Sequence, residues 1–345
     1  MLLFNPTLSS TINSPSGTYH YTLSRLSSHL ATISSDDRIR ILDPSNLSVV
    51  TTSPSPVHND VDNNGGVTCL KSLDENEPNI LFTAGRDGTA RLWDVRVGFE
   101  TAVRSFKKGS SRAAVLSLDV CKTRGLVGVG TELTGTSAEV IVWDLEGREK
   151  MSYVESHNDD VTQLAFHPTT PHLLLSGSTD GLINIYNMTI TEEDDALHQV
   201  INHGSSIHHA GFLSSEAIYG LSHDETLSVY KLADEREEVE EPQPVVFGDV
   251  RGRLGCEYAV DVLLRGRESS GTGILVVGSH SEGWVDLHSL KVGGDGKWGI
   301  GGEDVVRLVG GHGEEIVRCL YLDDASATVF TGGEDGLIKA WRPAS

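Results

Sequence analysis

Several features are scarce in this sequence, and each absence excludes a class of protein. Four cysteines are spread over 345 residues without a C-x-x-C pair, so we expect no disulfide framework and a reduced, intracellular protein. No stretch approaches the ~20 apolar residues that a membrane-spanning helix needs. The opening residues, MLLFNP, lack the basic and long apolar regions of a secretory signal.

Basic residues are also scarce. Lys and Arg total 27 against 49 Asp and Glu, which gives a formal net charge of −22. Because phosphate groups are bound by basic side chains, we expect neither nucleic acid nor an anionic membrane as a partner. Basic proteins or peptides are the natural electrostatic partners. The alternative is that the acidic surface serves only solubility.

What the sequence does contain is a repeat. The most similar copies read LFTAGRDGTARLWD (81–94), LLSGSTDGLINIYN (174–187) and VFTGGEDGLIKAWR (329–342). Each copy has a β-rich run, an Asp-Gly pair and a second run that ends near an aromatic residue, which predicts strand, tight turn and strand. With weaker copies between them, seven repeats end near residues 43, 94, 144, 187, 231, 288 and 342.

These repeats resemble those of the WD-repeat family, whose period is ~40–45 residues. The resemblance implies an all-β fold in which residues 1–345 form a single seven-bladed β-propeller of four-stranded blades. The last repeat stops after its third strand, so we expect an N-terminal strand, from residues 2–4 or 9–12, to complete it and close the ring. The motifs at 156–168, 222–225 and 332–335 resemble one branch of this family in particular.

Ser or Thr, His and Asp recur together, which is the composition of a hydrolase triad. The set repeats in separate blades, however, and the family resemblance implies buried structural tetrads, with repeat seven holding the only complete tetrad that contains Trp. Repeat five has Gly220 at the hydroxyl position, with His203 as its entry histidine. The expected tetrads are His157, Ser176, Asp180 and Tyr186 in repeat four, and His312, Thr331, Asp335 and Trp341 in repeat seven.

Metal and cofactor sites are not expected. His208 and His209 are adjacent on an expected strand, so their side chains should point to opposite faces. No Cys or His cluster has the tight spacing of a zinc site. The glycine-rich segment 293–299 lacks the spacing of a P-loop and is better interpreted as a surface insertion.

Two acidic segments lie between repeats and are expected at the surface. They are either solvated loops or docking sites for a basic partner, in which case they raise the association rate more than the affinity. Their residues are Glu192, Glu193, Asp194 and Asp195 in the first segment, and Glu237, Glu238, Glu240 and Glu241 in the second.

A separate motif closes repeat two. Asp87, Trp93, Asp94 and Arg96 resemble the box by which WD-repeat substrate receptors dock the DNA-damage-binding adaptor of cullin-4 ubiquitin ligases. In that box the closing arginine makes a charge-assisted contact with the adaptor. Many propellers carry the same pattern without a role in a ligase.

The family resemblance also implies where partners bind, because its propellers usually use one rim, where the inter-strand loops converge. By alignment with the tetrads, the rim positions are Arg86, Asp160, Thr179, His223, Glu315 and Glu334.

The favoured hypothesis is a non-catalytic scaffold or adaptor, chaperone-like toward a basic client such as a ribosomal protein, an assembly factor or a histone. We expect a monomer without cofactor or metal, in the cytoplasm, the nucleus or both. The alternative is a cullin-4 substrate receptor that docks through residues 93–96.

Overall fold

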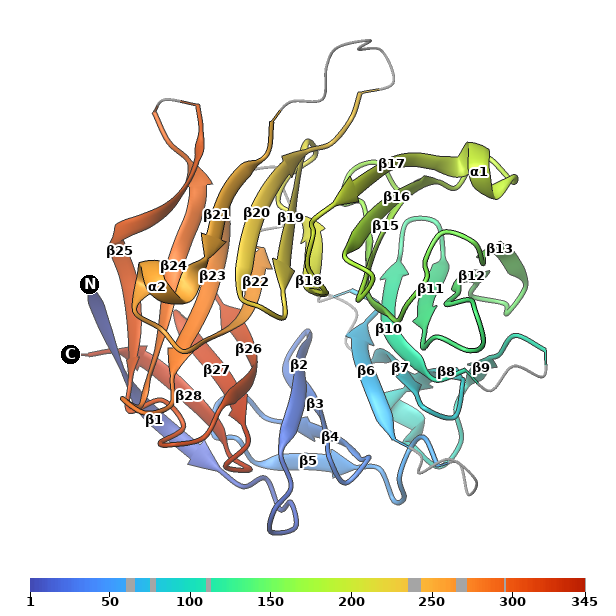
Figure 1. The fold of residues 1–345 in the computed structure, drawn as a ribbon. Helices are drawn as coiled ribbons and strands as arrows, with labels where there is room; N and C mark the ends of the chain where they lie inside the picture. Colours follow the sequence, from blue (N-terminus) through green and yellow to red (C-terminus); the bar gives the residue numbers. More distant parts are fainter. Residues whose placement is uncertain are drawn as a thin grey trace. The chain divides into compact units, whose positions relative to one another are not determined.

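The computed structural model describes residues 1–59, 66–74, 79–109, 113–234, 243–264, 272–294 and 296–344, with the backbone alone at 303 and 304 (Figure 1). Strands dominate these ranges. The helices described are the short α1 (Glu193–Ala196) and α2 (Val250–Leu254) and a 3-10 turn, η1 (Val95–Val97). Within the described ranges, no helix has the length and apolar character needed to cross a membrane.

The chain divides into two compact units. Unit 1 consists of Met1–Val115, Val277–Leu287 and Glu303–Ser345, and unit 2 of Leu116–Val276 and His288–Gly302. We number the groups of four strands sheet 1 to sheet 7, after the repeats that form them.

Unit 1 contains sheets 1 and 2, whose strands are hydrogen-bonded in chain order. Sheet 1 is formed by β2 (His20–Leu26), β3 (His29–Ser34), β4 (Ile39–Leu42) and β5 (Val49–Thr52). Sheet 2 is formed by β6 (Val67–Ser72), β7 (Ile80–Gly85), β8 (Ala90–Asp94) and β9 (Arg104–Phe106).

Unit 2 contains sheets 3, 4 and 5 with the same strand order, apart from Val115 at the start of β10. Sheet 3 is formed by β10 (Val115–Cys121), β11 (Leu126–Thr131), β12 (Val140–Asp144) and β13 (Glu149–Tyr153). Sheet 4 is formed by β14 (Val161–Phe166), β15 (Leu173–Ser178), β16 (Leu182–Asn187) and β17 (Leu197–Asn202). Sheet 5 is formed by β18 (Ile207–Phe212), β19 (Ala217–Ser222), β20 (Thr226–Lys231) and β21 (Val245–Asp249).

The remaining strands form one eight-stranded sheet in the order β22-β23-β24-β25-β1-β28-β27-β26. Its first four strands are sheet 6, and the other four are sheet 7. Strands β23, β24 and β25 contain residues of both units. The strands are β22 (Tyr258–Leu264), β23 (Thr272–Ser279), β24 (Trp284–Val292), β25 (Trp298–Val309), β1 (Leu2–Ser10), β26 (Val317–Asp323), β27 (Thr328–Gly333) and β28 (Ile338–Pro343).

The N-terminal strand completes the last repeat, as the sequence predicts. β1 pairs antiparallel with β28, from Phe4 opposite Pro343 to Ser10 opposite Ile338. It also pairs in parallel with β25. Ile12, just beyond β1, is buried at 1% exposure in a cluster with residues of β2, β27 and β28. The outer strand of sheet 7 therefore comes from the opposite end of the sequence.

The Asp-Gly pairs make the turns that define the repeats. Gly88, Gly181 and Gly336 have φ of 72°, 85° and 74°, a backbone region in which glycine is preferred. The preceding aspartate accepts a hydrogen bond from the amide two residues later, as Asp180 does from Leu182 at 2.9 Å. The side chain thus stabilises the turn that the glycine permits.

A one-residue bulge recurs at the start of the first strand in sheets 1, 2, 4, 5 and 7. In β18, for example, Ile207 is opposite Ser222 and His209 is opposite Leu221, so His208 is the extra residue. A bulge interrupts the alternation of side chains between the faces of a strand. The expectation that His208 and His209 point to opposite faces is therefore wrong, since their ring centroids are 4.1 Å apart.

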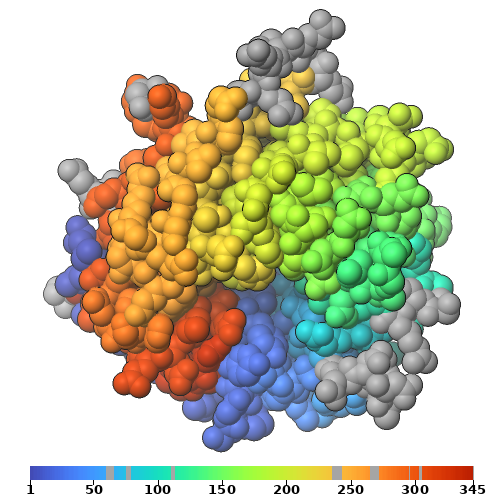
Figure 2. Space-filling view, in the orientation of Figure 1, coloured from blue at the N-terminus to red at the C-terminus, as the bar shows by residue number. Residues whose placement is uncertain are grey.

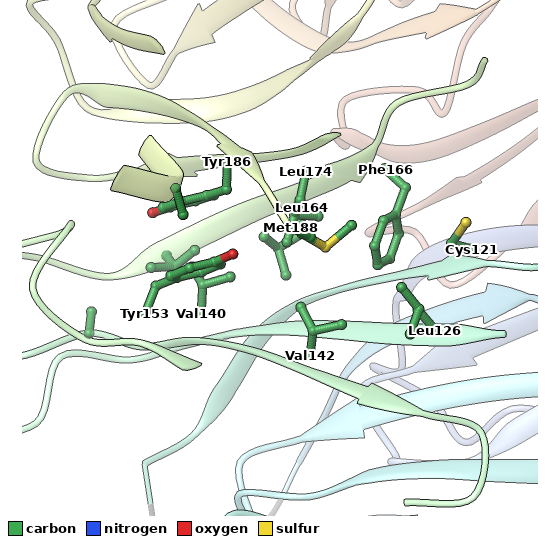
Figure 3. Packing of buried hydrophobic residues seen from close by; sticks show 13 residues of the cluster. Cys121, Leu126, Val140, Val142, Tyr153, Leu164, Phe166, Leu174, Tyr186 and Met188 are labelled. Carbon is green, nitrogen blue, oxygen red and sulfur yellow. The ribbon is translucent and has the colours of Figure 1, made fainter. Parts of the chain in front are cut away.

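Packing between neighbouring sheets of unit 2 depends on large apolar side chains. One cluster joins sheets 3 and 4, and its Tyr153 and Tyr186 rings stack at 4.2 Å with an interplanar angle of 5° (Figure 3). Sheets 4 and 5 pack together through β14, β15 and β18, and form neighbouring surfaces, green to yellow, in Figure 2. This packing places the loops of sheets 4 and 5 close together.

Candidate functional site

The expected residues of repeat four form a connected network in sheet 4. His157 Nδ1 lies 3.0 Å from Asp180 Oδ2, and Nε2 lies 2.7 Å from Ser176 Oγ. The Ser176 hydroxyl donates to Tyr186 Oη at 3.4 Å. Burial alone would raise the pKa of Asp180, but its contacts with His157 and two backbone amides lower it below the ordinary value. The network joins β15, β16 and the turn between them to the segment before β14.

Sheet 7 has the corresponding network with tryptophan. His312 Nδ1 lies 2.7 Å from Asp335 Oδ1 and Nε2 lies 2.7 Å from Thr331 Oγ1. Trp341 Nε1 donates to the same hydroxyl at 2.8 Å. Lys339 Nζ is 3.5 Å from Asp335 Oδ2, so the carboxylate also contacts a cation.

Sheet 2 corrects the expectation that only repeat seven carries a complete tetrad with tryptophan. His58 lies 2.9 Å from Asp87 and 2.8 Å from Thr83, and Trp93 donates to Thr83 at 2.9 Å. The histidine precedes its aspartate by 29 residues, against 23 in sheets 4 and 7. Because of this longer spacing, His58 was not identified from the sequence. A search upstream from Thr83, Asp87 and Trp93 that allowed an insertion would have found it.

These hydroxyls are placed for structure and are inaccessible to a substrate. Thr83, Ser176 and Thr331 are each 0% exposed. A nucleophilic hydroxyl must instead face a substrate beside an oxyanion hole. Burial and the repetition of the same contacts in three sheets indicate that the networks hold strands together.

Sheet 5 departs from this pattern as Gly220 predicts. A Cβ at Gly220 would lie 2.8 Å from Ile183 Cδ1 and 3.1 Å from His203 Nδ1. His203 occupies this space and contacts Tyr230 Oη at 2.8 Å and Thr226 Oγ1 at 3.2 Å. The entry histidine is therefore kept with different partners.

Sheet 1 holds a charged arrangement that sequence reasoning missed. Arg40, 2% exposed, forms a two-point ion pair with Asp36 and donates to Ser34 Oγ at 2.7 Å. His20 lies nearby at 0% exposure, and its pKa is lowered to about 4, chiefly by burial and then by Arg40. The alternation of Ile39, Arg40 and Ile41 hides this residue, because an arginine within a strand is usually solvated.

The rim positions share a backbone contact. In sheets 2, 4, 5 and 7 the amide of the residue before the turn bonds the carbonyl of the residue before the first strand. The four bonds run from Arg86 to Gly66, Thr179 to Asp160, His223 to Ser206 and Glu334 to Ile316, at 2.8 to 3.0 Å. Ser35 makes the same bond to Tyr19 in sheet 1 and is an equivalent position that the sequence reasoning omitted.

The side chains at these rim positions differ in their availability. Arg86, His223 and Glu315 are exposed. Asp160 Oδ1 accepts a hydrogen bond from the Leu133 amide at 2.8 Å, and Glu334 forms an ion pair with Arg318. The exposed three are thus the side chains most available to a partner.

The first acidic segment divides by role. Glu192, Asp194 and Asp195 are exposed at α1. The Glu193 carboxylate instead accepts hydrogen bonds from the amides of Val154 (2.8 Å) and Glu155 (2.9 Å). Glu193 therefore fastens the segment between β13 and β14. Residues 237, 238, 240 and 241 of the second segment lie outside the described residues.

The residues of the box in repeat two also have two different roles. Asp87 and Trp93 belong to the buried network of sheet 2. Arg96 is exposed, and its guanidinium bonds Asp94 at 2.9 and 2.6 Å beside the short turn η1. Asp249 and Arg251 repeat this pairing at α2, at 3.0 and 2.8 Å. An Asp-x-Arg pair is therefore a local way to cap a short helix in this protein.

Comparison with known proteins agrees with the repeat structure. The model of the WD domain, G-beta repeat, matches residues 55–94, 148–187 and 303–342. A WD repeat-containing protein of Schizosaccharomyces pombe is 32% identical over 274 residues, 76% of this chain and 80% of its own length.

Two further relatives are informative. A WD repeat-containing protein of Saccharomyces cerevisiae is 36% identical over 264 residues, 76% of this chain but only 64% of its own length. The WD repeat-containing protein 89 homolog of Dictyostelium discoideum is 31% identical over 157 residues, 45% of this chain and 40% of its own length. It bears the name of the branch that the motifs at 156–168, 222–225 and 332–335 resemble. WD repeats generally serve as non-catalytic scaffolds for binding other proteins. The repeats, the four-stranded sheets and these relatives together place the chain in the WD-repeat family of β-propeller proteins.

Proposed function

We propose that this protein is a non-catalytic scaffold with a chaperone-like action on a basic client, such as a ribosomal protein, an assembly factor or a histone. The net charge of −22 carries the proposal, because a surface of this charge attracts Lys- and Arg-rich proteins and repels nucleic acid and anionic membrane. The protein acts as a monomer in the cytoplasm, the nucleus or both, without a cofactor.

The described carboxylates of the first acidic segment support this proposal. Asp194 and Asp195 are exposed on the short helix α1 and Glu192 is exposed just before it, where these carboxylates can meet a partner. Charged groups at such a position chiefly raise the rate of association, and salt screens them within about 10 Å at 0.1 M.

Affinity capture from the protein's own cells, at low and moderate salt, tests the proposal. We expect one strongly basic protein to be recovered at low salt and reduced at moderate salt. Changing Glu192, Asp194 and Asp195 to Lys should lower the association rate with that protein and leave the thermal stability nearly unchanged. The matched variant Glu193→Lys should instead lower the melting temperature, because it strands the two amides. A recovered protein that is acidic, or an association rate independent of these charges, would overturn the proposal.

The exposed Arg96 supports a second candidate, a substrate receptor of a cullin-4 ubiquitin ligase. The side chain is 66% exposed and already oriented by Asp94, so an adaptor can reach it. We expect Arg96→Glu to abolish copurification of the adaptor, while the matched variant Arg251→Glu leaves it unchanged. Equal copurification with both variants would dismiss this candidate.

A further inference from the structure

Three histidines of sheet 5 form a cluster at the rim. The bulge in β18 brings the rings of His208 and His209 to 4.1 Å, and the ring of His223 stacks on His208 at 4.7 Å with an interplanar angle of 27°. We call His208, His209 and His223 the imidazole cluster. His223 is exposed, and His208 stacks on its ring.

Carboxylates surround this cluster. Asp261 Oδ1 lies 3.6 Å from His209 Nδ1, and Asp224 follows His223 in an exposed turn. The Ser205 hydroxyl donates to Asp224 at 2.7 Å, which fixes the carboxylate beside the cluster. Glu225 accepts a hydrogen bond from the Ala259 amide at 3.0 Å.

The other charged groups near the cluster come from neighbouring elements. Arg251, at the start of α2, bonds the Asp224 carbonyl at 3.4 Å, and its charge is balanced by Asp249 at 2.8 Å. The charged side chains around the imidazoles are therefore mostly acidic.

Burial favours the neutral form of the His223 ring. Burial lowers the pKa of His223, His209 lowers it further, and Asp224 opposes them. A neutral imidazole presents a flat π-face, as the aromatic rings of other binding sites do. The cluster thus combines an exposed flat ring with nearby negative charge.

We propose that the imidazole cluster is a seat for an arginine side chain of the basic client. A guanidinium is planar and weakly hydrated, so it stacks on an aromatic face and pairs with carboxylates at its edge. On His223 it would extend the stack that His208 begins, with Asp224, the next residue in the chain, at hand for its charge. A lysine ammonium has no plane to stack, and an acidic side chain would meet the surrounding carboxylates. This inference rests on the proposed function and identifies the residue type that the client presents.

A metal ion suits this cluster less well. Ring nitrogens bind metals through lone pairs in the ring plane, which must converge on one point. The rings of His208 and His223 are stacked, with centroids 4.7 Å apart, rather than arranged around one point. Consistent with this, no group of three His, Cys, Asp or Glu side chains in the described ranges is placed to hold a metal ion.

Two model peptides test the seat. They share one Gly/Ser-rich sequence of equal charge, with either arginine or lysine as the basic residues, and their affinities are measured by calorimetry at pH 7.5 and low salt. We expect the arginine peptide to bind about threefold to fivefold more tightly, which is the size of an exposed cation–π contact. The imidazole signals of His223 should shift in NMR spectra on its addition.

Variants separate the seat from general charge attraction. His223→Ala should reduce the affinity for the arginine peptide to that for the lysine peptide, and His223→Phe, which keeps a flat ring, should restore the preference. His29→Ala, at the first residue of β3 in sheet 1, is the matched control and should have no effect.

The outcomes distinguish this inference from the proposed function. Equal binding of both peptides would overturn the arginine seat and leave the basic-client function standing. Failure of both peptides to bind would overturn both. An arginine preference that survives in His223→Ala, or that His29→Ala also removes, would place the preference elsewhere and overturn the seat.

Discussion

Sheets 2 and 7 differ from sheet 1 in how their inner strands are held, although all three have the same strand frame. In sheets 2 and 7 a histidine from the preceding segment bridges a threonine and the turn aspartate, and tryptophan closes the network. In sheet 1 the turn aspartate, Asp36, is instead bound by Arg40, which also reaches Ser34. The turn aspartate is thus bound by a histidine in sheets 2 and 7 and by an arginine in sheet 1.

The difference lies in how much charge is buried. Arg40, Arg91 and Lys339 occupy the same position, four residues after the turn aspartate. Their side chains are 3%, 27% and 15% exposed, respectively. Sheet 1 therefore depends most on its ion pair, because the guanidinium takes the role that histidine has elsewhere. A buried pair is costly to break from one side, whereas an exposed pair contributes little.

The largest expected effect comes from breaking the pair in sheet 1. Arg40→Ala leaves Asp36 without its cation in a partly buried site, and should lower the free energy of unfolding by about 3–5 kcal/mol. The matched variant Arg91→Ala removes the more exposed cation of sheet 2 and leaves Asp87 bonded to His58 and Thr89, so it should cost less than Arg40→Ala. Denaturant unfolding followed by tryptophan fluorescence measures both. An equal loss of unfolding free energy in the two variants would show that the burial of the cation does not decide how much each ion pair contributes.

A second expected effect concerns acid stability and His20. Its pKa is about 4 in the folded protein against about 6.5 in an unfolded chain, so between these values the unfolded chain binds the additional proton. The contribution of neutral His20 to stability is therefore fully present above pH 6.5. As the pH falls to 4, the free energy of unfolding decreases by about 3 kcal/mol. His20→Val, with the residue type found at Val67 and Val317 in the same register, should remove this part of the loss.

Unfolding curves at pH 7 and pH 4.5 measure this effect, because the variant should lose less stability between the two than the native protein. His29→Val, at the half-buried first residue of β3, serves as the control. An unchanged difference between the two pH values in His20→Val would contradict the assignment.

The turns, strands and repeat ends could be predicted from the sequence because they depend on residues that are neighbours in the chain. Asp-Gly pairs such as Asp180 and Gly181 set the turns, and the runs beside them set the strands, so repeat ends and four-stranded sheets follow from neighbouring residues. The unfinished last repeat likewise predicts that β1 must pair with β28. The tetrads of sheets 4 and 7 could be named because their spacing is regular.

What the sequence hid depends on distance or on irregular geometry. His58 stands farther from its aspartate than the other entry histidines do, and Glu193 reaches amides 38 and 39 residues earlier in the chain. The bulge at His208 breaks the two-residue period, so a rule about alternating faces fails there. The contact of Glu193 and the bulge at His208 arise only when separate segments are packed, whereas His58 requires a search that allows an insertion before Thr83.

The smallest of the expected effects compares the two tryptophan networks with each other. Asp335→Ala strands His312, and Asp87→Ala strands His58, so each should cost about 1–3 kcal/mol of unfolding free energy. Asp87 should be the more costly, because it also accepts from Thr89 at 2.7 Å and pairs with Arg91 at 2.7 Å, whereas Lys339 lies 3.5 Å from Asp335. Burial would raise the pKa of Asp87, but His58, Thr89 and Arg91 lower it to about 2. The contribution of this carboxylate is therefore present above its unfolded value and is lost as the pH falls through 2. Denaturant unfolding at pH 7 measures the cost of both variants, with the exposed Glu315→Ala as control. A larger cost for Asp335→Ala than for Asp87→Ala would show that the contacts with Arg91 and Lys339 do not decide which aspartate contributes more.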